Sequence, residues 1–289
     1  MLSESKDIDR SRRVGLLGWP VGHSVSPAMH NAAFLAMGLA WHYQALPVHP
    51  DQLGERLAEL VDSGFRGTNV TVPHKQAVVA LIDEISHAAR VIGAVNTVIV
   101  GPDGYLSGDN TDWQGFLHPL DGHGFDLAGK QVVLLGAGGS ARAVCYALAR
   151  RKVASITIWN RKAGRAEQLA VHCHSFFPEV TVAFGTDLAT LPVSEADMVV
   201  NTTPVGMWPK DGETAWPSDE PLPAEALFYD LVYRPQRTLF LQQAERAGCA
   251  TQDGLDMLVA QGAISIELWT GQSPPMDIMA AAALAALKK

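Results

Sequence analysis

Short apolar runs alternate with amphipathic segments in the first half of the chain. Arg13–Gly18 predicts a buried strand that ends at a glycine. Pro27–Met37 predicts a helix, with Ser26 as its N-cap and Pro27 at its first position. The same patterns predict strands at Trp41–Pro47 and Gly67–Val72, a helix at Leu53–Ser63, and a turn-and-strand unit that Val91–Ile92 and Val95–Val100 surround. Strands that alternate with helices in this way indicate an α/β domain with a largely parallel sheet.

The second half of the chain carries a more apolar version of the same alternation. Lys130–Leu135 is a continuous apolar run, which is typical of a strand covered on both faces of a sheet. A glycine-rich segment follows it and opens the next predicted helix. Pro204–Pro223 predicts a surface loop. Further strands are predicted at Ser155–Trp159, Val180–Phe184, Met198–Val200 and Phe228–Leu231. This half is therefore predicted to be a Rossmann-like, doubly wound unit.

The length of 289 residues exceeds the size at which a single core usually stops growing, so two α/β domains are expected. We assign residues 1–112 to an N-terminal domain with a mostly parallel sheet and residues 113–251 to the doubly wound domain. Residues 252–289 are helical in pattern and rich in alanine, and we expect them to return to the first domain.

Composition and charge narrow the function classes. Apolar residues make up 47% of the chain and charged residues 18%, which excludes wholesale disorder. The 22 basic and 30 acidic residues give a net charge of −8, so we expect neither nucleic acid nor an anionic membrane as a partner. We also expect no signal peptide and no spanning helix, since no apolar run reaches about 18 residues.

Three cysteines without a CxxC spacing are typical of reduced thiols, so a cytoplasmic location is expected. One of them lies in the triplet His172-Cys173-His174. We interpret this triplet as part of a strand, where alternation would turn Cys173 away from its neighbours. Because no second cluster completes a tetrahedral set, no metal site is expected.

The segment after the predicted strand 130–135 reads Gly136-Ala137-Gly138-Gly139-Ser140-Ala141, which fits the pattern G-x-G-x-x-A. Glycines here permit a tight turn and close approach of a pyrophosphate, and the helix N-terminus supplies free N–H donors. A glycine turn that serves packing alone is the alternative. The position between a strand and a helix favours a dinucleotide site.

The end of the next strand indicates which dinucleotide is bound. NAD enzymes place an acidic residue there to bind the ribose 2′-hydroxyl. This chain instead has Asn160, Arg161 and Lys162, with Arg165 one turn later. A charge-assisted hydrogen bond from arginine to a 2′-phosphate contributes about 1.5–3 kcal/mol, which favours NADP. The alternative is an exposed basic corner. Thr202, in the polar segment Asn201–Met207 after another strand, is also expected beside the cofactor.

Polar residues gather at the predicted strand ends of the first domain. Ser24 and Ser26 stand two apart, and Asn69 and Thr71 alternate along one strand. Each of these residues has a simpler explanation, such as a helix cap for Ser26 or a strand-edge residue for Asn69. Lys75 could likewise be a solvated charge and Asp112 a helix cap, and Asn96 also has a simpler explanation when it is taken singly. Their combination favours a site for a polar ligand.

These blocks, in this order, resemble the shikimate dehydrogenase family over nearly the whole chain. The resemblance rests on residues 22–27, 69–75, 93–97, 108–112, 136–141, 160–161, 201–207, 229–233 and 254–261. It implies that Ser24 and Ser26 hold a substrate carboxylate with help from Tyr233. It implies that ring hydroxyls are bound by Asn69, Thr71, Asn96, Asp112 and Gln261. Lys75 and Asp112 would form the catalytic pair.

The resemblance further implies reversible, NADPH-dependent reduction of 3-dehydroshikimate to shikimate, a step towards chorismate and the aromatic amino acids. Lys75 as an ammonium would donate a proton to the developing alkoxide, and Asp112 would orient it. Cofactor contacts are implied for Leu231, where many relatives carry methionine, and for Gly254. Ser140 replaces a common alanine of the glycine turn. A monomer or a homodimer is expected.

Two other functions stay open at this point. One is a quinate/shikimate dehydrogenase with relaxed cofactor use, because relatives that act on quinate share nearly all of these residues. The other is a non-catalytic NADP-binding paralogue, against which the presence of both Lys75 and Asp112 argues.

Overall fold

The computed structural model describes residues 12–217 and 220–288. Within these residues the chain forms two compact units. Unit 1 comprises residues 12–86, 95–109 and 262–288, and unit 2 comprises residues 87–94 and 110–261 apart from the two undescribed positions. The assignment of a substrate domain to 1–112 and 252–289 and of a nucleotide domain to 113–251 stays a prediction.

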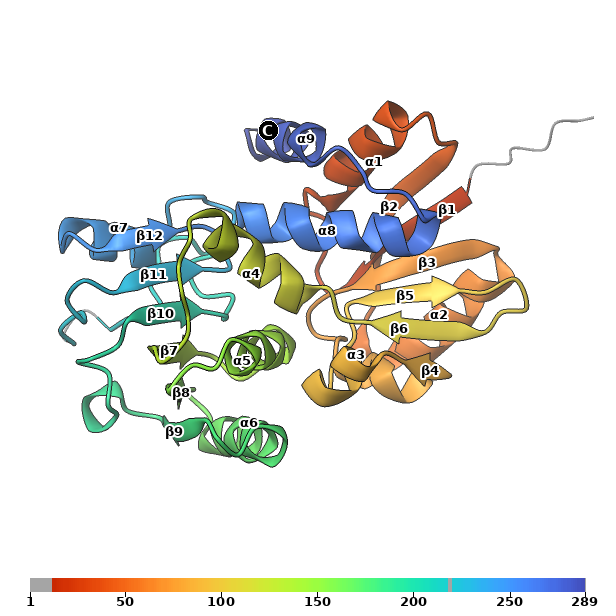
Figure 1. Cartoon of the computed structure of the whole chain (residues 1–289). Coiled ribbons are helices and arrows are strands. Elements are labelled where there is room, and N and C mark those ends of the chain that lie inside the picture. The colour runs from red at the N-terminus through yellow and green to blue at the C-terminus, as the bar shows by residue number, and fades with distance from the viewer. Residues whose placement is uncertain (1–11, 218–219, 289) are drawn as a thin grey trace, which may run out of the picture. The chain divides into compact units, whose positions relative to one another are not determined.

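Unit 1 contains a six-stranded sheet in the order β2-β1-β3-β5-β6-β4 (Figure 1). Its strands are β1 (Arg12–Gly18), β2 (Trp41–Pro47), β3 (Phe65–Val70), β4 (Glu84–Ile85), β5 (Thr97–Val100) and β6 (Leu106–Asp109). β1 pairs in parallel with β2 and β3, whereas β5 is antiparallel to both β3 and β6. The sheet is thus parallel on one side and mixed on the other. β4 and β6 were not predicted, and β3 ends two residues earlier than expected.

The helices of unit 1 follow from the amphipathic segments of the sequence. They are α1 (Ser26–Ala36), α2 (Leu53–Asp62) and α9 (Met276–Leu287), with the short 3₁₀ helices η1 (Pro50–Gln52) and η2 (Ala77–Leu81). α9 packs along α1, and its many alanines permit this close approach. α8 (Leu255–Thr270) begins among the residues of unit 2 and ends among those of unit 1. Val25, not Ser26, occupies the N-cap position of α1, so the predicted cap was one residue off.

Unit 2 contains a six-stranded, fully parallel sheet in the order β12-β11-β10-β7-β8-β9. Its strands are β7 (Gln131–Leu135), β8 (Ser155–Trp159), β9 (Thr181–Gly185), β10 (Met198–Asn201), β11 (Leu227–Asp230) and β12 (Ala250–Gln252). Its other helices are α3 (His87–Ile92), α4 (Asp112–Gly122), α5 (Gly139–Arg150), α6 (Ala163–Phe176), η3 (Leu188–Thr190) and α7 (Leu239–Arg246). Val132 and Leu134 of β7 belong to one core cluster, and Val133 and Leu135 belong to another. The prediction of a central strand covered on both faces is confirmed.

One local prediction in this unit was wrong, namely that the triplet 172–174 belongs to a strand. The triplet lies inside α6, because the helical period of α6 continues through it, and His172 Nε2 bonds the carbonyl of Val91, in helix α3, at 2.6 Å. The described residues of the predicted surface loop 204–223 form neither helix nor strand, and 208–213 are exposed. The same loop carries the buried side chain of Trp216, which is 1% exposed and packs edge-on against Phe228.

Candidate functional site

The two serines of the candidate carboxylate site lie together at the start of α1. Ser24 Oγ is 3.1 Å from Ser26 Oγ and accepts the N–H of Ser26 at 3.2 Å. The backbone N–H of Ser24 donates to Val21 O at 3.1 Å, which fixes the turn that precedes the helix. Two hydroxyls at a helix N-terminus are suited to an anionic group, because the helix end adds N–H donors and a partial positive charge.

The backbone around Lys75 is held on both sides. Thr71 N–H donates to Leu17 O at 2.8 Å, and His74, which is buried, bonds the carbonyl of Val48 through Nε2 at 2.8 Å. The carbonyl of Lys75 itself accepts the N–H of Val95 at 2.8 Å. The side chain of Lys75 is half-buried. These contacts fix the backbone from which the Lys75 side chain extends.

Asn69 and Asn96 lie in one buried polar network at the ends of β3 and β5. Asn69 Nδ2 is 3.2 Å from the carbonyl of Asn96 and 3.1 Å from Thr97 Oγ1. The Thr97 hydroxyl in turn donates to Asn96 Oδ1 at 3.0 Å. Asn69 and Asn96 are 4% and 2% exposed, so both amides are ordered by the protein. The structure therefore brings these two predicted residues together.

Asp112 and Gln261 come together within unit 2. Asp112 is the first residue of α4, and its N–H donates to Asn110 Oδ1 at 3.1 Å. The hydroxyl of Thr111, the residue before Asp112, donates to the carbonyl of Gln261 at 3.0 Å. Asp112 occupies the first turn of α4, and Thr111 occupies the N-cap position. Tyr233, the remaining predicted substrate residue, is half-buried in the segment that follows β11.

The glycine turn of unit 2 has the geometry that a dinucleotide site requires. Gly136 has φ +109°, and a Cβ at this position would lie 2.6 Å from Thr202 Oγ1, so only glycine fits. The Thr202 hydroxyl donates to Leu135 O at 2.7 Å. Gly138 occupies the N-cap of α5, and a Cβ there would meet nothing within 4 Å. The turn from Gly136 through Ala137 to Gly139 and Ser140 thus leaves space at the helix N-terminus, where a pyrophosphate binds in such folds.

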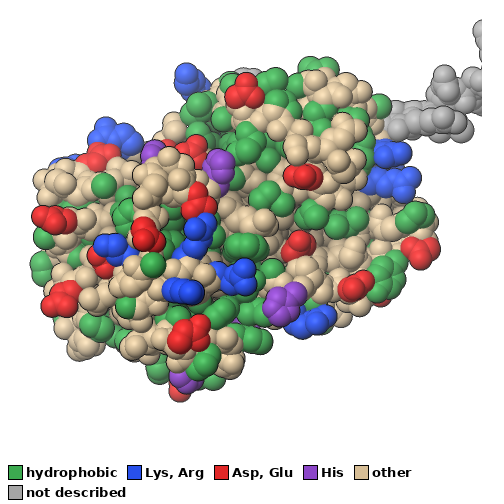
Figure 2. Space-filling view, in the orientation of Figure 1, with side chains coloured by type: hydrophobic (Ala, Val, Ile, Leu, Met, Phe, Trp, Pro, Cys, Tyr) green, Lys and Arg blue, Asp and Glu red, His purple; other side chains and the backbone are tan. Residues whose placement is uncertain are grey.

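The corner after β8 is basic. Arg161, Lys162 and Arg165 are all exposed, and α6 begins at Ala163. Asn160 closes the turn by donating from Nδ2 to Lys162 O at 2.9 Å. On the visible face of unit 2, Figure 2 shows Lys and Arg side chains interspersed with Asp and Glu side chains. Arg161 and Arg165 suit the 2′-phosphate of NADP, because guanidinium groups match phosphate oxygens in a bidentate manner.

A second buried network, which the sequence interpretation missed, supports the strand ends beside Thr202. Asp230 Oδ1 accepts Asn201 Nδ2 at 2.9 Å, and Asp230 Oδ2 accepts the hydroxyl of Thr238 at 2.6 Å. Asn201 Oδ1 accepts the hydroxyl and the N–H of Thr203 at 2.7 and 3.0 Å. Burial raises the pKa of Asp230 to about 6 although these hydrogen bonds oppose the shift. An aspartate directly after the apolar strand 227–229 was the signal that could have revealed it.

Gly254 lies against the main chain that follows this network. A Cβ there would be 2.2 Å from the carbonyl oxygen of Leu231, and the N–H of Gly254 donates to Val232 O at 3.3 Å. The residues predicted to contact the cofactor at positions 231 and 254 are therefore adjacent. Their close approach explains the requirement for glycine.

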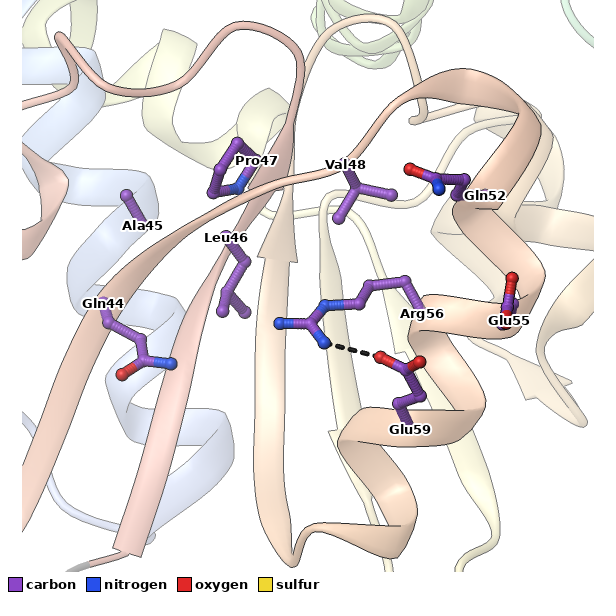
Figure 3. Close-up of a pocket in the computed structure, with 9 residues that line it drawn as sticks. All are labelled: Gln44, Ala45, Leu46, Pro47, Val48, Gln52, Glu55, Arg56 and Glu59. Carbon is purple, nitrogen blue, oxygen red and sulfur yellow. Dashed lines mark hydrogen bonds and ion pairs between the residues drawn. The ribbon is translucent and has the colours of Figure 1, made fainter.

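A cavity of about 550 Å³ lies elsewhere in unit 1, between β2 and α2 (Figure 3). Arg56 extends towards the strand and pairs with Glu59 at 2.5 Å. The residues predicted to bind substrate or cofactor do not line this cavity. The candidate site is therefore defined by its polar groups and not by this hollow.

Residues 12–217 and 220–288 contain no group of three or more His, Cys, Asp or Glu side chains that could hold a metal ion. In the same ranges no helix combines the length and the apolar character that crossing a membrane requires.

Three family profiles match the chain in sequence order. The profile described as the shikimate dehydrogenase substrate binding domain matches residues 16–98. The shikimate/quinate 5-dehydrogenase profile matches residues 121–205, and the shikimate 5′-dehydrogenase C-terminal domain profile matches residues 254–284.

Individual relatives match over nearly the whole chain. The "Shikimate dehydrogenase (NADP(+))" of Moorella thermoacetica is 48% identical over 92% of this chain and 90% of its own length. The crystal structure of shikimate 5-dehydrogenase from Thermus thermophilus with NADP(H) and shikimate is 40% identical, covers 95% of this chain and 99% of that one, and has a TM-score of 0.82. Quinate dehydrogenase from Corynebacterium glutamicum, in complex with NAD, is 34% identical, covers 95% of this chain and 99% of that one, and has a TM-score of 0.85. With relatives of such identity and coverage, this chain belongs to the shikimate dehydrogenase family.

Proposed function

We propose that this chain is an NADP-dependent oxidoreductase that reduces 3-dehydroshikimate reversibly to shikimate, in the biosynthesis of chorismate and the aromatic amino acids. The observation that carries the proposal is the near full-length identity of 48% to a relative named for this activity. The local geometry within each unit is compatible with it, since the backbone of Lys75 is held by hydrogen bonds in unit 1 and the turn at Gly138 leaves space for a pyrophosphate in unit 2.

The substrate residues are proposed from the family pattern and the local geometry. Ser24 and Ser26, whose hydroxyls lie 3.1 Å apart, would bind the carboxylate with help from Tyr233. Ring hydroxyls would be bound by Asn69, Thr71, Asn96, Asp112 and Gln261. Hydroxyl and amide groups orient a polyhydroxylated ring well, because each can act as a directional donor or acceptor.

Lys75 and Asp112 are proposed as the catalytic pair. Reduction of a ketone to a secondary alcohol requires a hydride at carbon and a proton at oxygen, and the bound NADPH supplies the hydride. The Lys75 ammonium would donate a proton to the developing alkoxide oxygen and polarise the carbonyl beforehand. In the oxidation direction the neutral amine would accept the hydroxyl proton. Asp112 would orient the lysine and the reacting hydroxyl.

The cofactor would be held along the strand ends of unit 2. The turn of Gly136, Ala137, Gly138, Gly139 and Ser140 would bind the pyrophosphate. Thr202, Leu231 and Gly254 would border the nicotinamide half. The 2′-phosphate would be bound by Asn160, Arg161, Lys162 and Arg165, which leave no carboxylate at that corner to repel it.

The same proposal includes the roles of the two domains, the cellular compartment and the oligomeric state. The substrate domain would comprise 1–112 and 252–289, and the nucleotide domain would comprise 113–251. We propose a cytoplasmic monomer or homodimer whose ligands are small molecules. The three cysteines, Cys145, Cys173 and Cys249, are buried free thiols, which fits a reducing compartment.

The direct test is turnover by the purified full chain. 3-Dehydroshikimate and NADPH are mixed with the protein, the loss of NADPH absorbance is followed, and the product is identified by mass spectrometry and retention time. We expect stoichiometric formation of shikimate. A well-folded sample that binds NADPH and converts neither 3-dehydroshikimate nor shikimate would refute the proposal and would favour the non-catalytic paralogue.

A second candidate function is quinate/shikimate oxidation with relaxed cofactor use. It is favoured by the likeness to the Corynebacterium quinate dehydrogenase, which was solved with NAD. The basic corner at 161–165 argues for NADP and so against this alternative. Turnover with quinate and NAD that exceeds turnover with shikimate and NADP would establish it.

A further inference from the structure

A continuous chain of buried hydrogen bonds runs through unit 1 from Tyr43 to Asn96. The phenol of Tyr43 donates to Asn69 Oδ1 at 2.9 Å. Asn69 Nδ2 is 2.9 Å from Ser265 Oγ and 3.1 Å from Thr97 Oγ1. The hydroxyl of Thr97 then donates to Asn96 Oδ1 at 3.0 Å. None of these five residues is more than 4% exposed, so water does not compete for their hydrogen bonds.

The number of available hydrogens limits which group donates and which accepts in this series of hydrogen bonds. Thr97 has a single hydroxyl hydrogen, which it donates to Asn96 Oδ1. Ser265 Oγ lies 2.9 Å from Thr97 Oγ1, and the geometry of that contact allows either hydroxyl to be the donor. Asn69 Nδ2 has two hydrogens and three acceptors, the third being the carbonyl of Asn96 at 3.2 Å. Donation runs from Tyr43 to Asn69, from Asn69 to Thr97 and Ser265, and from Thr97 to Asn96.

These contacts favour the observed orientation of both side-chain amides. A flip of Asn69 would turn its carbonyl oxygen towards the carbonyl of Asn96, where no hydrogen bond can form. A flip of Asn96 would remove the acceptor Oδ1 from Thr97, whose hydroxyl would then have to donate to Ser265. Loss of a buried hydrogen bond costs about 1–3 kcal/mol for the group left unsatisfied, so the flip of Asn69 is disfavoured.

These orientations give the two amides complementary roles. Asn69 Oδ1 accepts a hydrogen bond from Tyr43, and an amide oxygen has two lone pairs. Asn96 Oδ1 is engaged by Thr97, so its Nδ2 is the end that is directed away from Thr97. An acceptor from Asn69 and a donor from Asn96 match an alcohol, which donates and accepts at once. A keto or ether oxygen accepts only.

We propose that Thr97, backed by Ser265 and Tyr43, is a positioning residue that sets Asn69 and Asn96 to recognise a ring hydroxyl of the substrate. The inference rests on the proposed function, in which these two asparagines bind ring hydroxyls. It adds three residues that do not touch the substrate themselves. It also states the polarity of the recognition, with Asn69 as acceptor and Asn96 as donor.

The test replaces the Thr97 hydroxyl by a methyl group of the same size, in Thr97→Val. We measure kcat and KM for shikimate and for shikimate analogues that each lack one non-reacting ring hydroxyl, with NADP throughout. Thr97→Val should lower kcat/KM for shikimate about tenfold, mainly through KM, with the KM for NADP unchanged. For one deoxy analogue the loss should shrink to less than about twofold, because the hydroxyl that the network recognises is absent. Thr97→Ser, which keeps the hydroxyl, should recover most of the loss.

Two further variants keep the test decisive. Thr157→Val removes a buried threonine hydroxyl from β8 of unit 2 and serves as the matched control, with kcat/KM for shikimate unchanged. Ser265→Ala is the substitute test if Thr97→Val does not fold. It leaves Asn69 Nδ2 two acceptors, so we expect a smaller decrease in kcat/KM for shikimate, about threefold.

The outcomes separate the inference from the proposed function. A wild-type chain without turnover of shikimate overturns both. An active wild type refutes the inference alone if Thr97→Val and Ser265→Ala change thermal stability but not kcat/KM. Equal losses on shikimate and on every deoxy analogue also refute it, since they would show a general structural effect.

Discussion

Each of the two sheets has a buried polar network at the strand ends that carry candidate site residues, and the two networks differ in chemical character. In unit 1 the network around Asn69 consists of amides and hydroxyls, with the ring of His30 stacked on Tyr43 at 4.0 Å. In unit 2 the network around Asn201 is centred on the carboxyl group of Asp230. Both are almost fully buried. The difference matters because amides do not titrate, whereas each buried titratable group, such as His30 beside the first network or Asp230 in the second, makes stability depend on pH.

The pKa shifts of His30 and Asp230 act in opposite directions over nearly the same pH range. Burial lowers the pKa of His30 to about 4 and raises the pKa of Asp230 to about 6. His30 takes up a proton less readily in the folded chain than in the unfolded chain, and Asp230 takes one up more readily. Their effects on the free energy of unfolding therefore oppose each other between about pH 4 and pH 6.

The largest effect is expected on kcat, at Lys75, and this variant distinguishes the chemical step from cofactor binding. Lys75→Ala should lower kcat for shikimate about 10²- to 10⁴-fold, because a placed proton donor is lost, while the Kd of NADPH stays within about twofold. Steady-state kinetics and fluorescence titration of NADPH measure the two quantities. Lys210→Ala, at an exposed lysine of unit 2, is the control. Full turnover by Lys75→Ala would remove the catalytic assignment.

The next effect concerns His30, which is completely buried and whose Nε2 has no partner among the described residues. Its folded pKa lies below its ordinary value of 6.5, so its contribution to stability is present above pH 6.5 and is lost as pH falls towards 4. The loss is on the order of 3 kcal/mol. His30→Phe should remove this acid sensitivity. Urea unfolding from pH 7 to pH 4 measures it, and an unchanged pH profile would contradict the role of His30.

Asp230→Asn tests the opposite dependence of the free energy of unfolding on pH, in unit 2. Because the folded pKa of about 6 lies above the ordinary value of 3.8, the folded chain binds the proton more tightly. The wild type therefore loses stability from this group as pH rises from about 4 to about 6, by on the order of 3 kcal/mol. Asp230→Asn should abolish that loss, so the variant gains stability relative to the wild type as pH rises. The same urea series tests this, and a difference between variant and wild type that does not vary with pH would refute it.

A smaller effect is expected at the basic corner of unit 2. Arg161→Ala combined with Arg165→Ala should raise the KM for NADP about 10- to 100-fold and leave the KM for NAD and for shikimate nearly unchanged. Arg151→Ala, at an exposed arginine paired with Asp121, is the matched control. Equal losses with NADP and NAD would show that these cations do not recognise the 2′-phosphate.

The sequence predicted the regular parts of both sheets well. The prediction for β8 matches its observed bounds, and β7 lies within one residue of its prediction. Apolar runs rich in β-branched residues reveal such strands because burial on both faces admits few other residues. The short strands β4, β6 and β12 were missed, since two to four residues carry too little periodicity.

Sequence motifs identified the candidate site residues, but they did not identify the buried residues that form hydrogen bonds to them. Ser24 with Ser26, and the glycine turn at 136, could be recognised because spacing along the chain determines their geometry. Ser265 lies 196 positions from Asn69, so no local pattern could connect them. The buried Trp216 was assigned to a surface loop for the same reason, because its packing partners come from other elements.

The most direct measurement of the central claim is a comparison of kcat/KM for shikimate and quinate, each with NADP and with NAD, on the wild-type chain. We predict the highest value for shikimate with NADP, a loss of at least about tenfold with NAD because the cations at 161–165 lose the 2′-phosphate, and a lower value for quinate with either cofactor. A highest value for quinate with NAD, or no turnover in any of the four combinations, would contradict it.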